Sequence, residues 1–524
     1  MMKKLSFLLF LPLLFSGCSS SGTSASDSIN LITPDIMNKH ISFLASDEMK
    51  GRKTPSQELD NAAHYIAEEF ESLGLKPVNG SYFQTVHLGK VDLGKDNRLV
   101  IKKDGKEHSF SLKTEFTPFE MTGNKEVTSS IVFAGYGITA PELKYDDYKD
   151  IDVNGKIVIL LRHAPGENDT ASAFSSKPAI TYSLGSTKVN NAIKHGATGV
   201  ILVNDPLNHM LLSPRGFPWP ALSAFIPKDA LPITLLSEEK DKVPVVQAGK
   251  EVINELFGSV ESLKDLQKGI DAKLTPKSFE IEGASVLLKT STDVMETPAN
   301  NVVGFLEGSD PALKNELVIV GAHYDHVGYQ KEHKEGEDYI YNGADDNASG
   351  TSGVMALARA FSAMNPRPKR SILFITFAGE ELGLLGSKAY TESPLFPLEK
   401  TVAMLNMDMI GRNNPDSLFI IGSSVCPELS RLNKEENVKV GFKLGYSLEK
   451  FLDASDQASF IGKGVPSIFY NTGETEDYHH FSDETSTINM DKAARVAKLV
   501  FLTALRISED SSYNRTFYQP ISNK

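Results

Sequence analysis

Cysteine is nearly absent from this chain of 524 residues, which has only Cys18 and Cys426. With so few thiols, a disulfide-stapled scaffold is excluded. No base partner stands near Cys426 in the sequence, so we interpret it as a small buried hydrophobe and not as a nucleophile. The fold must therefore be stabilised by its hydrophobic core.

An excess of basic charge is also absent. The chain has 54 Lys and Arg against 67 Asp and Glu, a net charge of −13. A surface of this sign repels phosphate, which argues against nucleic acid as a partner. Internal repeats are lacking too. The hydrophobic content of 40% and the charged content of 23% are typical of a globular protein, here long enough for two or three domains.

The N-terminal apolar run, residues 5–15, is too short to span a membrane. Lys3 and Lys4 precede it and Phe15-Ser-Gly-Cys follows, as in export signals. A plain secretory signal is one interpretation. The favoured one is a bacterial lipoprotein signal over 1–17, because the run's end resembles a lipobox, although Phe15 stands where Leu is commoner. Cys18 would then carry lipid, and residues 18–30 would form a Ser-rich tether.

Strand and helix patterns alternate from residue 301 onward. Apolar runs predict strands at 317–321, 370–377, 402–407, 417–421 and 467–470, and helical spacing predicts helices at 348–364, 382–390 and 491–505. This alternation predicts an α/β fold with a mostly parallel sheet flanked by helices. Residues 31–90 begin with two predicted helices and join residues 285–510 in one discontinuous domain. Residues 100–280 change to short β runs, which predicts a β-rich insert, and 511–524 form a tail. Within the insert, the apolar spacing of residues 246–257 predicts a helix.

Most of the predicted strands are followed by residues that bind metal ions or act as acids and bases. In an open α/β sheet, ligands bind beyond the carboxyl ends of the strands. Asp345 precedes helix 348–364, near its expected N-cap. The residues that follow strands are His323, Glu380, Glu381, Asp408, Tyr478 and His479.

Two imidazoles and three carboxylates, with no thiolate, form a donor set that suits zinc. If one carboxylate bridges, two ions can each have a histidine and a further carboxylate. Glu380 and Glu381 point in different directions, so one can bind metal while the other moves protons. Taken singly, the Asp345–Asp346 pair would be an ordinary N-cap and the glutamate pair a solvated helix start. Their joint occurrence after successive strands favours a metal site.

These segments resemble the di-zinc peptidases typified by secreted bacterial leucyl aminopeptidases, which are related to glutamate carboxypeptidase. The matching motifs are GAHYDH, NGADDNASG, FAGEELGLLGS, LNMDMIGR and DYHHFSDET, in the family's order. The resemblance implies that His323 and Asp408 bind one zinc ion and Glu381 and His479 the other. It implies Asp345 as the bridge between the two ions.

The resemblance also assigns the remaining roles. Glu380 is expected to be the general base and acid for a hydroxide that bridges the two zinc ions. Asp325 is expected to orient the ligand histidine, and Tyr478 to donate to the developing oxyanion. Asp346 and His326 are then supporting residues.

The insert carries its own resemblance. The motifs VFAGYGITAPELKYDDY, GKIVILLR and NNAIKHGATGVILVND resemble a protease-associated domain, which many of these peptidases carry inside the peptidase domain. The implied architecture is a phosphorylase/hydrolase-like zinc exopeptidase fold with this β-rich insert. The implied protein is an envelope lipoprotein, facing the periplasm and anchored in the outer rather than the inner membrane, or a secreted protein.

The expected activity is hydrolysis of the first residue from peptides with a free N-terminus. A carboxypeptidase, a dipeptidase or a glutaminyl cyclase on the same scaffold remains an alternative, as does a non-catalytic receptor-like protein. Arg412 is the single cation near the metal motifs, where a carboxypeptidase would need several. Gln457 departs from a histidine found in some members, and we expect this change to affect the substrate side at most.

Overall fold

The computed structural model describes residues 23–119, 121–166, 169, 172–175, 182–214, 231–236, 242–513 and 515. Cys18, the expected export signal and most of the predicted tail lie outside these residues. Contacts divide the described residues into two units: one contains those up to Gln84 and those from Asn300, and the other contains Thr85–Ala299. No helix within the described ranges is long and apolar enough to cross a membrane.

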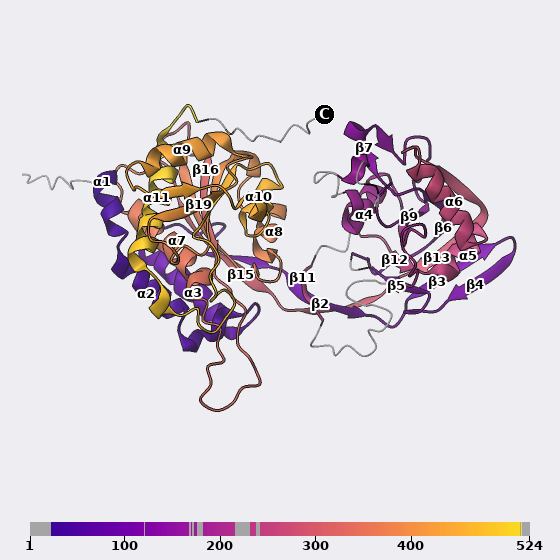
Figure 1. Cartoon of the computed structure of the whole chain (residues 1–524), viewed down its shortest axis with the longest axis horizontal. Coiled ribbons are helices and arrows are strands. Elements are labelled where there is room, and N and C mark those ends of the chain that lie inside the picture. Colours follow the sequence, from indigo (N-terminus) through magenta and orange to yellow (C-terminus); the bar gives the residue numbers. More distant parts are fainter. Residues whose placement is uncertain are drawn as a thin grey trace, which may run out of the picture. The chain divides into compact units, whose positions relative to one another are not determined.

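The first unit is built on an eight-stranded sheet with the order β1-β15-β17-β16-β18-β21-β19-β20 (Figure 1). Its strands are β1 (Phe83–Val86), β15 (Ala299–Leu306), β16 (Leu317–His323), β17 (Ser371–Phe377), β18 (Thr401–Met407), β19 (Ser417–Ile421), β20 (Lys443–Gly445) and β21 (Ser467–Asn471). The central strands β17, β16, β18 and β21 are parallel, whereas β15 and β19 pair antiparallel with their neighbours. The predicted mostly parallel sheet is confirmed.

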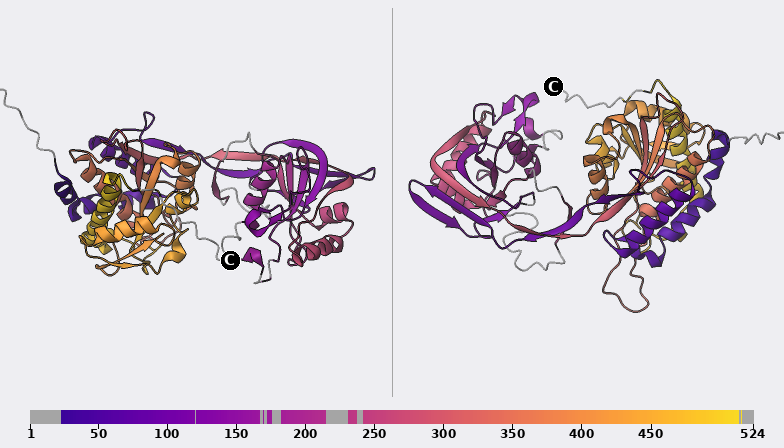
Figure 2. Two further views of the ribbon diagram at one scale, coloured as in Figure 1. Left: turned by 90° about the horizontal axis from the view of Figure 1, so that it is seen from above. Right: turned by 180° about the vertical axis from the view of Figure 1, so that it is seen from behind.

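Helices cover both faces of this sheet (Figures 1 and 2). They are α1 (Ala25–Ser28), α2 (Pro34–Leu44), α3 (Gln57–Ser72), α7 (Gly350–Ser362), α8 (Leu385–Glu392), α9 (Pro427–Asn437), α10 (Gln457–Ile461) and α11 (Met490–Glu509). Every residue of β16, β17 and β18 is buried, as expected for continuous apolar strands in a covered parallel sheet. One face packs Ile319 and Leu373 against Tyr390 of α8 and Phe460 of α10, and α7 and α11 contact the central strands as well.

Polar side chains begin several of these helices. Thr33 accepts from the amide of Ile36, and Ser56 accepts from that of Leu59. A side-chain cap satisfies one of the amides that a helix start leaves without an internal partner.

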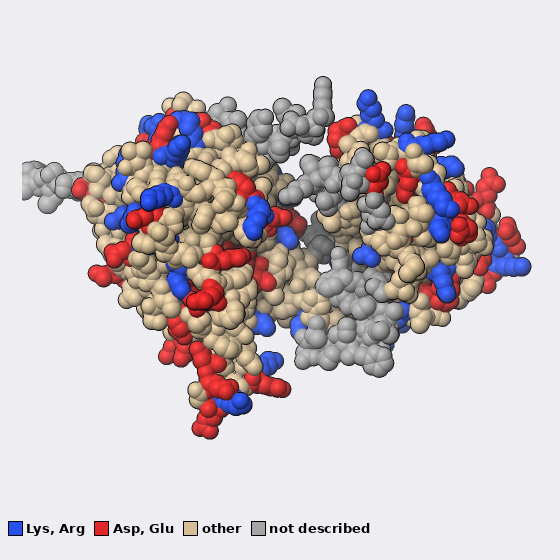
Figure 3. Space-filling model, in the orientation of Figure 1, with Lys and Arg blue, Asp and Glu red and all other residues tan. Residues whose placement is uncertain are grey.

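Away from the core, the segment between Tyr329 and Ile340 is an exposed acidic loop (Figure 3) that carries Glu332, Glu335, Glu337 and Asp338.

The second unit has an eight-stranded sheet of its own, ordered β4-β3-β13-β6-β9-β10-β12-β5. The strands are β3 (Arg98–Lys103), β4 (Lys106–Phe110), β5 (Phe116–Pro118), β6 (Glu126–Ala134), β9 (Ile157–Leu161), β10 (Gly199–Val203), β12 (Val245–Ala248) and β13 (Ser278–Lys289). Neighbours from β6 to β12 run parallel. Helices α4 (Gly185–Lys194), α5 (Lys250–Phe257) and α6 (Val260–Asp271) complete the unit.

Smaller sheets complete the second unit: β2 (Leu88–Leu93) pairs with β14 (Thr292–Glu296) and β11 (Ile233–Leu235), and β7 (Thr139–Ala140) pairs with β8 (Tyr145–Asp146). One local expectation is wrong. Residues 246–257 read as a single helix, yet the structure has a buried strand, β12, before α5. Pairing with β10 and β5 on either side overrides the local helical spacing.

Candidate metal centre

Three neighbouring parallel strands deliver the candidate ligands to one edge of the sheet. His323 is the last residue of β16, Asp408 directly follows β18, and Glu380 and Glu381 follow β17. Because β17, β16 and β18 are adjacent and parallel, their carboxyl ends meet. The structure thus brings together side chains that lie 85 positions apart in the chain, from 323 to 408.

A turn before α7 adds the carboxylate at the centre. The turn, Ala344–Ser349, follows Gly343, whose φ of 60° is left-handed. The Asp483 carboxylate accepts from the amides of Asp345 (2.9 Å) and Asp346 (3.0 Å), which fixes the backbone of the turn. Asp346 points its side chain at the strand ends.

The prediction that Asp345 is the shared carboxylate is wrong. Its Oδ1 accepts from the amide of Gly411 at 2.7 Å, on the other side of the turn, whereas Asp346 faces the histidines. In this turn the two side chains have different partners, so Asp346 alone of the two faces the histidines. Neither of them caps α7, whose N-cap is Ser349. The sequence carries no signal that separates two adjacent aspartates.

One group of potential ligands consists of His323, Asp346 and Asp408, all buried. His323 Nε2 lies 3.4 Å from Asp346 Oδ1 and 3.3 Å from Asp408 Oδ1. Ser455 donates its hydroxyl to Asp408 Oδ2 at 2.9 Å, while Asp408 Oδ1 is buried without a hydrogen-bond partner among the described residues. One ligand atom from each of the three residues therefore faces the same point.

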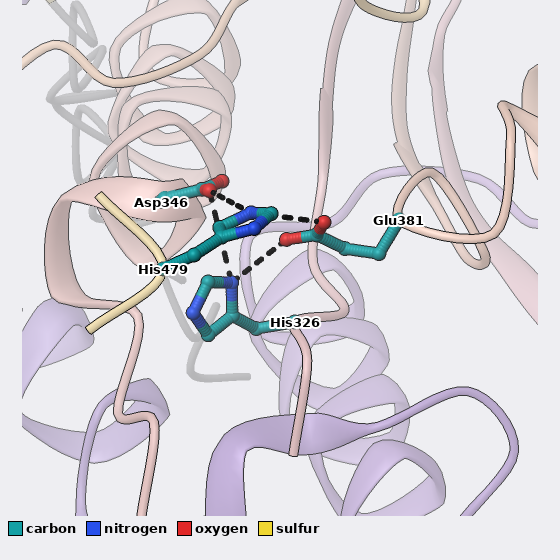
Figure 4. A group of neighbouring side chains, drawn as sticks. All are labelled: His326, Asp346, Glu381 and His479. Atoms are coloured by element: carbon teal, nitrogen blue, oxygen red, sulfur yellow. Dashed lines mark hydrogen bonds and ion pairs between the residues drawn. The ribbon is translucent and has the colours of Figure 1, made fainter. Parts of the chain in front are cut away.

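The second group shares Asp346 and adds Glu381, His479 and His326 (Figure 4). His479 Nε2 lies 3.1 Å from both Asp346 Oδ2 and Glu381 Oε2. His326 Nδ1 donates to Glu381 Oε1 at 2.8 Å. Asp346 therefore presents one oxygen to each group. His326, which the sequence led us to expect only as a supporting residue, stands in direct contact with a candidate ligand.

The buried carboxylates of the site create a negative potential, which stabilises positive charge there and therefore suits a metal cation. Hydrogen bonds to Asp346 and Glu381 raise the pKa of His479 to about 10. Burial lowers the pKa of His323, but Asp408 and Glu380 outweigh it and raise the pKa well above its ordinary value. Buried carboxylates in such number are costly unless cations compensate them. Imidazole nitrogens and carboxylate oxygens without a thiolate are a donor set that fits zinc.

Asp325 lies behind His323, although its carboxylate is not the closest partner of the ring. His323 Nδ1 donates to the backbone carbonyl of Asp325 at 3.2 Å and lies 3.6 Å from its carboxylate. The Asp325 carboxylate accepts from the amide of Glu380 at 3.1 Å and from the hydroxyl of Thr54 at 2.9 Å. Asp325 thus connects the end of β16 with the segment that carries Glu380 and Glu381.

Glu380 and Tyr478 line a cavity of about 520 Å³ beside the two groups. Burial raises the pKa of Glu380 well above its ordinary value, helped by the carboxylates of Asp408 and Glu381 against the charge of His323. Tyr478 is 38% exposed and stacks on His479. Its lining also includes the apolar side chains of Met409, Phe419, Ile421, Leu448, Phe451 and Phe469, together with polar residues such as Asn413, Ser417, Lys450 and Asn471.

Arg412 and Gln457, which the sequence singled out, do not belong to the lining of this cavity. The Arg412 guanidinium pairs with the Asp477 carboxylate and donates to the Thr487 hydroxyl at 2.6 Å. Its charge is therefore engaged within the protein. Gln457 is buried and accepts from the side chain of Asn406 at 2.9 Å, below the strand end that carries Asp408.

Comparison with known families gives two matches. Residues 301–504 match the model of peptidase family M28, and residues 127–256 match that of the PA domain. The first segment contains all the candidate ligands, and the second lies within the unit Thr85–Ala299. The predicted resemblance to this peptidase family, with a protease-associated domain as an insert, is confirmed.

Similar proteins share this organisation to different extents. A "Glutamate carboxypeptidase 2 homolog" of Caenorhabditis elegans is 23% identical over 82% of this chain and 61% of its own length. A "Probable leucine aminopeptidase" of Trichophyton verrucosum is 34% identical over 33% of this chain and 48% of its length. Aminopeptidase YwaD of Bacillus subtilis is 27% identical over 70% and 66%. The chain thus spans about half to two thirds of these relatives.

Among solved structures, an aminopeptidase from Aneurinibacillus sp. strain AM-1 is similar, with 21% identity and a TM-score of 0.46. The likeness covers 94% of this chain and 98% of that one.

Proposed function

We propose that this chain, with its peptidase family M28 segment and inserted PA domain, is a zinc-dependent aminopeptidase that removes the N-terminal residue from peptides. One observation carries the proposal: Asp346 lies between two groups of ligand atoms, and Glu380 lines the cavity next to both. Shared carboxylates of this kind are characteristic of two-metal hydrolytic sites.

His323 and Asp408 would hold one zinc ion, and Glu381 and His479 the other, with Asp346 contacting both. When bound, the ions supply an activated water and polarise the peptide carbonyl. Asp325 keeps His323 and the backbone of Glu380 in register, since it touches both. A residue that holds a ligand from behind fixes its orientation and raises metal affinity, as Asp325 would for the ring of His323. His326 would likewise hold the carboxylate of Glu381 through its hydrogen bond.

Glu380 would take the proton of the attacking water and return it to the leaving amine. Burial raises the pKa of Glu380, which favours a carboxylate that can hold the proton until the amine leaves. Tyr478 borders the same cavity and would donate its hydroxyl to the oxyanion that develops on the carbonyl oxygen.

The apolar residues of the cavity lining support a proposal for the substrate. Phe419, Ile421, Phe451 and Phe469 surround space for a large aliphatic or aromatic side chain, and the acidic end of the cavity, with Asp346, Glu380 and Asp408, suits a free amine. Peptides with a bulky apolar first residue are therefore the proposed substrates.

The decisive experiment compares aminoacyl-anilide hydrolysis by the wild type, Glu380→Gln and Glu392→Gln. Glu380→Gln should lower kcat by about a hundredfold or more while zinc content stays unchanged, because it removes only the proton carrier. Glu392→Gln, an exposed glutamate at the end of α8, is the matched control and should behave as the wild type. A Glu380→Gln enzyme within about tenfold of the wild type contradicts the assigned role.

Amine-blocked peptides separate this proposal from a carboxypeptidase on the same scaffold. An aminopeptidase fails to cleave them, whereas a carboxypeptidase cleaves them from the other end. The engagement of Arg412 with Asp477 and Thr487 leaves it poorly suited to clamp a substrate carboxylate. Cleavage of blocked peptides at rates equal to free ones would overturn the aminopeptidase proposal.

We further propose that the chain is anchored to the bacterial envelope through lipid on Cys18. The proposal is supported by the order of Lys3, Lys4, the apolar run and FSGC. Cys18→Ser should abolish incorporation of radiolabelled palmitate and release the protein from the membrane fraction. Equal labelling of both forms contradicts it.

A further inference from the structure

The PA insert holds a second cluster of metal-binding side chains, separate from the catalytic centre in sequence and in structural unit. Donor atoms of His163, Asp205 and His209 lie within 4.8 Å of one another. All three residues belong to the unit Thr85–Ala299, while the candidate catalytic ligands belong to the other unit. Nothing in the proposed hydrolysis uses this cluster.

The sheet of the insert builds the cluster in the same way that the peptidase sheet builds its own. Parallel strands β9 and β10 end in register at Leu161 and Val203. His163 and Asp205 each stand two residues beyond those ends, so they meet at the carboxyl edge of the sheet. A turn then returns the chain, with the amide of His209 donating to the carbonyl oxygen of Asp205 at 3.1 Å.

Asp205 is the buried centre of this cluster, with no exposed side-chain surface. Its Oδ1 accepts from His163 Nδ1 at 2.7 Å and from the His163 amide at 3.1 Å. Its Oδ2 is buried without a hydrogen-bond partner in the described part of the chain, although His209 Nε2 lies 3.4 Å away. A buried carboxylate oxygen without a donor is costly, and a cation between it and the imidazole nitrogen would remove that cost.

Charge pairing alone does not account for the arrangement. The rings of His163 and His209 are stacked with centroids 4.1 Å apart, so two protonated imidazoles would repel each other while sharing one carboxylate. The donor atoms of all three residues instead face one another, as the ligands of one metal ion do.

We infer that His163, Asp205 and His209 bind a divalent transition-metal ion, with zinc as the best match to two imidazoles and one carboxylate. The side chains of His163 and His209 are 25% and 33% exposed, so the ion can enter from solvent and can complete its coordination with water. The bound ion ties together the segments that follow β9 and β10 and stabilises the insert.

Zinc per chain, measured on the whole protein after equilibrium dialysis, tests this site. His163→Ala/His209→Ala and Asp205→Asn should each bind one equivalent fewer than the wild type. His108→Ala is the matched control, because His108 lies in the same insert and pairs with a single carboxylate, Glu255. It should keep the wild-type content. Equal zinc in all four proteins overturns the inference and leaves an ion pair only.

A second measurement does not depend on the variants folding. In zinc-soaked crystals of the wild type, anomalous scattering at the zinc edge should show a peak between Asp205 and the two imidazoles; an empty position there overturns the inference. The result is independent of the catalytic proposal. Loss of the catalytic zinc leaves this peak in place, and loss of this peak leaves hydrolysis of aminoacyl-anilides intact.

Discussion

The contrast between two adjacent aspartates is the sharpest test of the catalytic centre. Asp346 offers one oxygen to each ligand group, at 3.4 Å from His323 Nε2 and 3.1 Å from His479 Nε2. Asp346→Asn keeps the size of the side chain and removes its charge. Loss of a mere partner behind a ligand costs about ten- to a hundredfold in metal affinity. Loss of the shared anion should cost at least about a hundredfold, or about 2.8 kcal/mol, for each ion.

Asp345→Asn is the matched variant, with the same chemical change one residue away. Burial and the Asp483 carboxylate raise the pKa of Asp345 to about 8, so its carboxyl is mostly neutral at pH 7. The amide oxygen of asparagine can still accept from the amide of Gly411. Zinc affinity should therefore change by less than about tenfold in this variant.

Competition with a chromophoric chelator measures zinc affinity for both proteins, and anilide hydrolysis reports the consequence. We expect Asp346→Asn to lose metal and activity together and Asp345→Asn to keep both. The reverse order would show that Asp345 is the shared ligand and would refute the geometry of the turn described above. Equal and small effects of both changes would refute a shared carboxylate altogether.

Three further expectations concern stability and specificity. Arg52 is buried and donates to the carbonyl oxygens of Leu44, Tyr324, Asn342 and Gly343, so Arg52→Met should lower the free energy of unfolding in urea by at least about 3 kcal/mol. An effect like that of the exposed Lys53→Met, expected near zero, would contradict this. Burial lowers the pKa of His40 to about 4, so the native state keeps it neutral. Stability should therefore fall by up to about 3 kcal/mol as pH drops from 6.5 towards 4, and His40→Gln should flatten the profile. A profile that rises in that window would refute the assignment. Phe451→Ala should reduce the preference for leucyl over alanyl anilides in kcat/KM by about tenfold, and an unchanged ratio would place the side-chain pocket elsewhere.

The general architecture was readable from the chain because each signal is local. Continuous apolar runs such as 317–321 and 402–407 are strands in the structure, and residues 417–421 coincide with β19. Carboxyl ends of adjacent parallel strands meet, so the sequence alone assigns the strand-end residues His323, Glu381 and Asp408 to one site. The helix predicted over residues 246–257 was wrong because a short apolar run fits a strand as well as a helix, and only pairing with β10 decides between them.

The amino-acid sequence by itself thus determined the sheet, the insert and most of the potential ligands. Tertiary structure decided which way side chains point: Asp346 inward and Asp345 towards Gly411, and His326 against Glu381. It also brought His163 and Asp205 together across two strands of the insert, a pairing with no motif in the chain. The physical reason is that the direction of a side chain in a turn depends on hydrogen bonds to residues far away in the sequence. Here the amides of residues 345 and 346 donate to the carboxylate of Asp483.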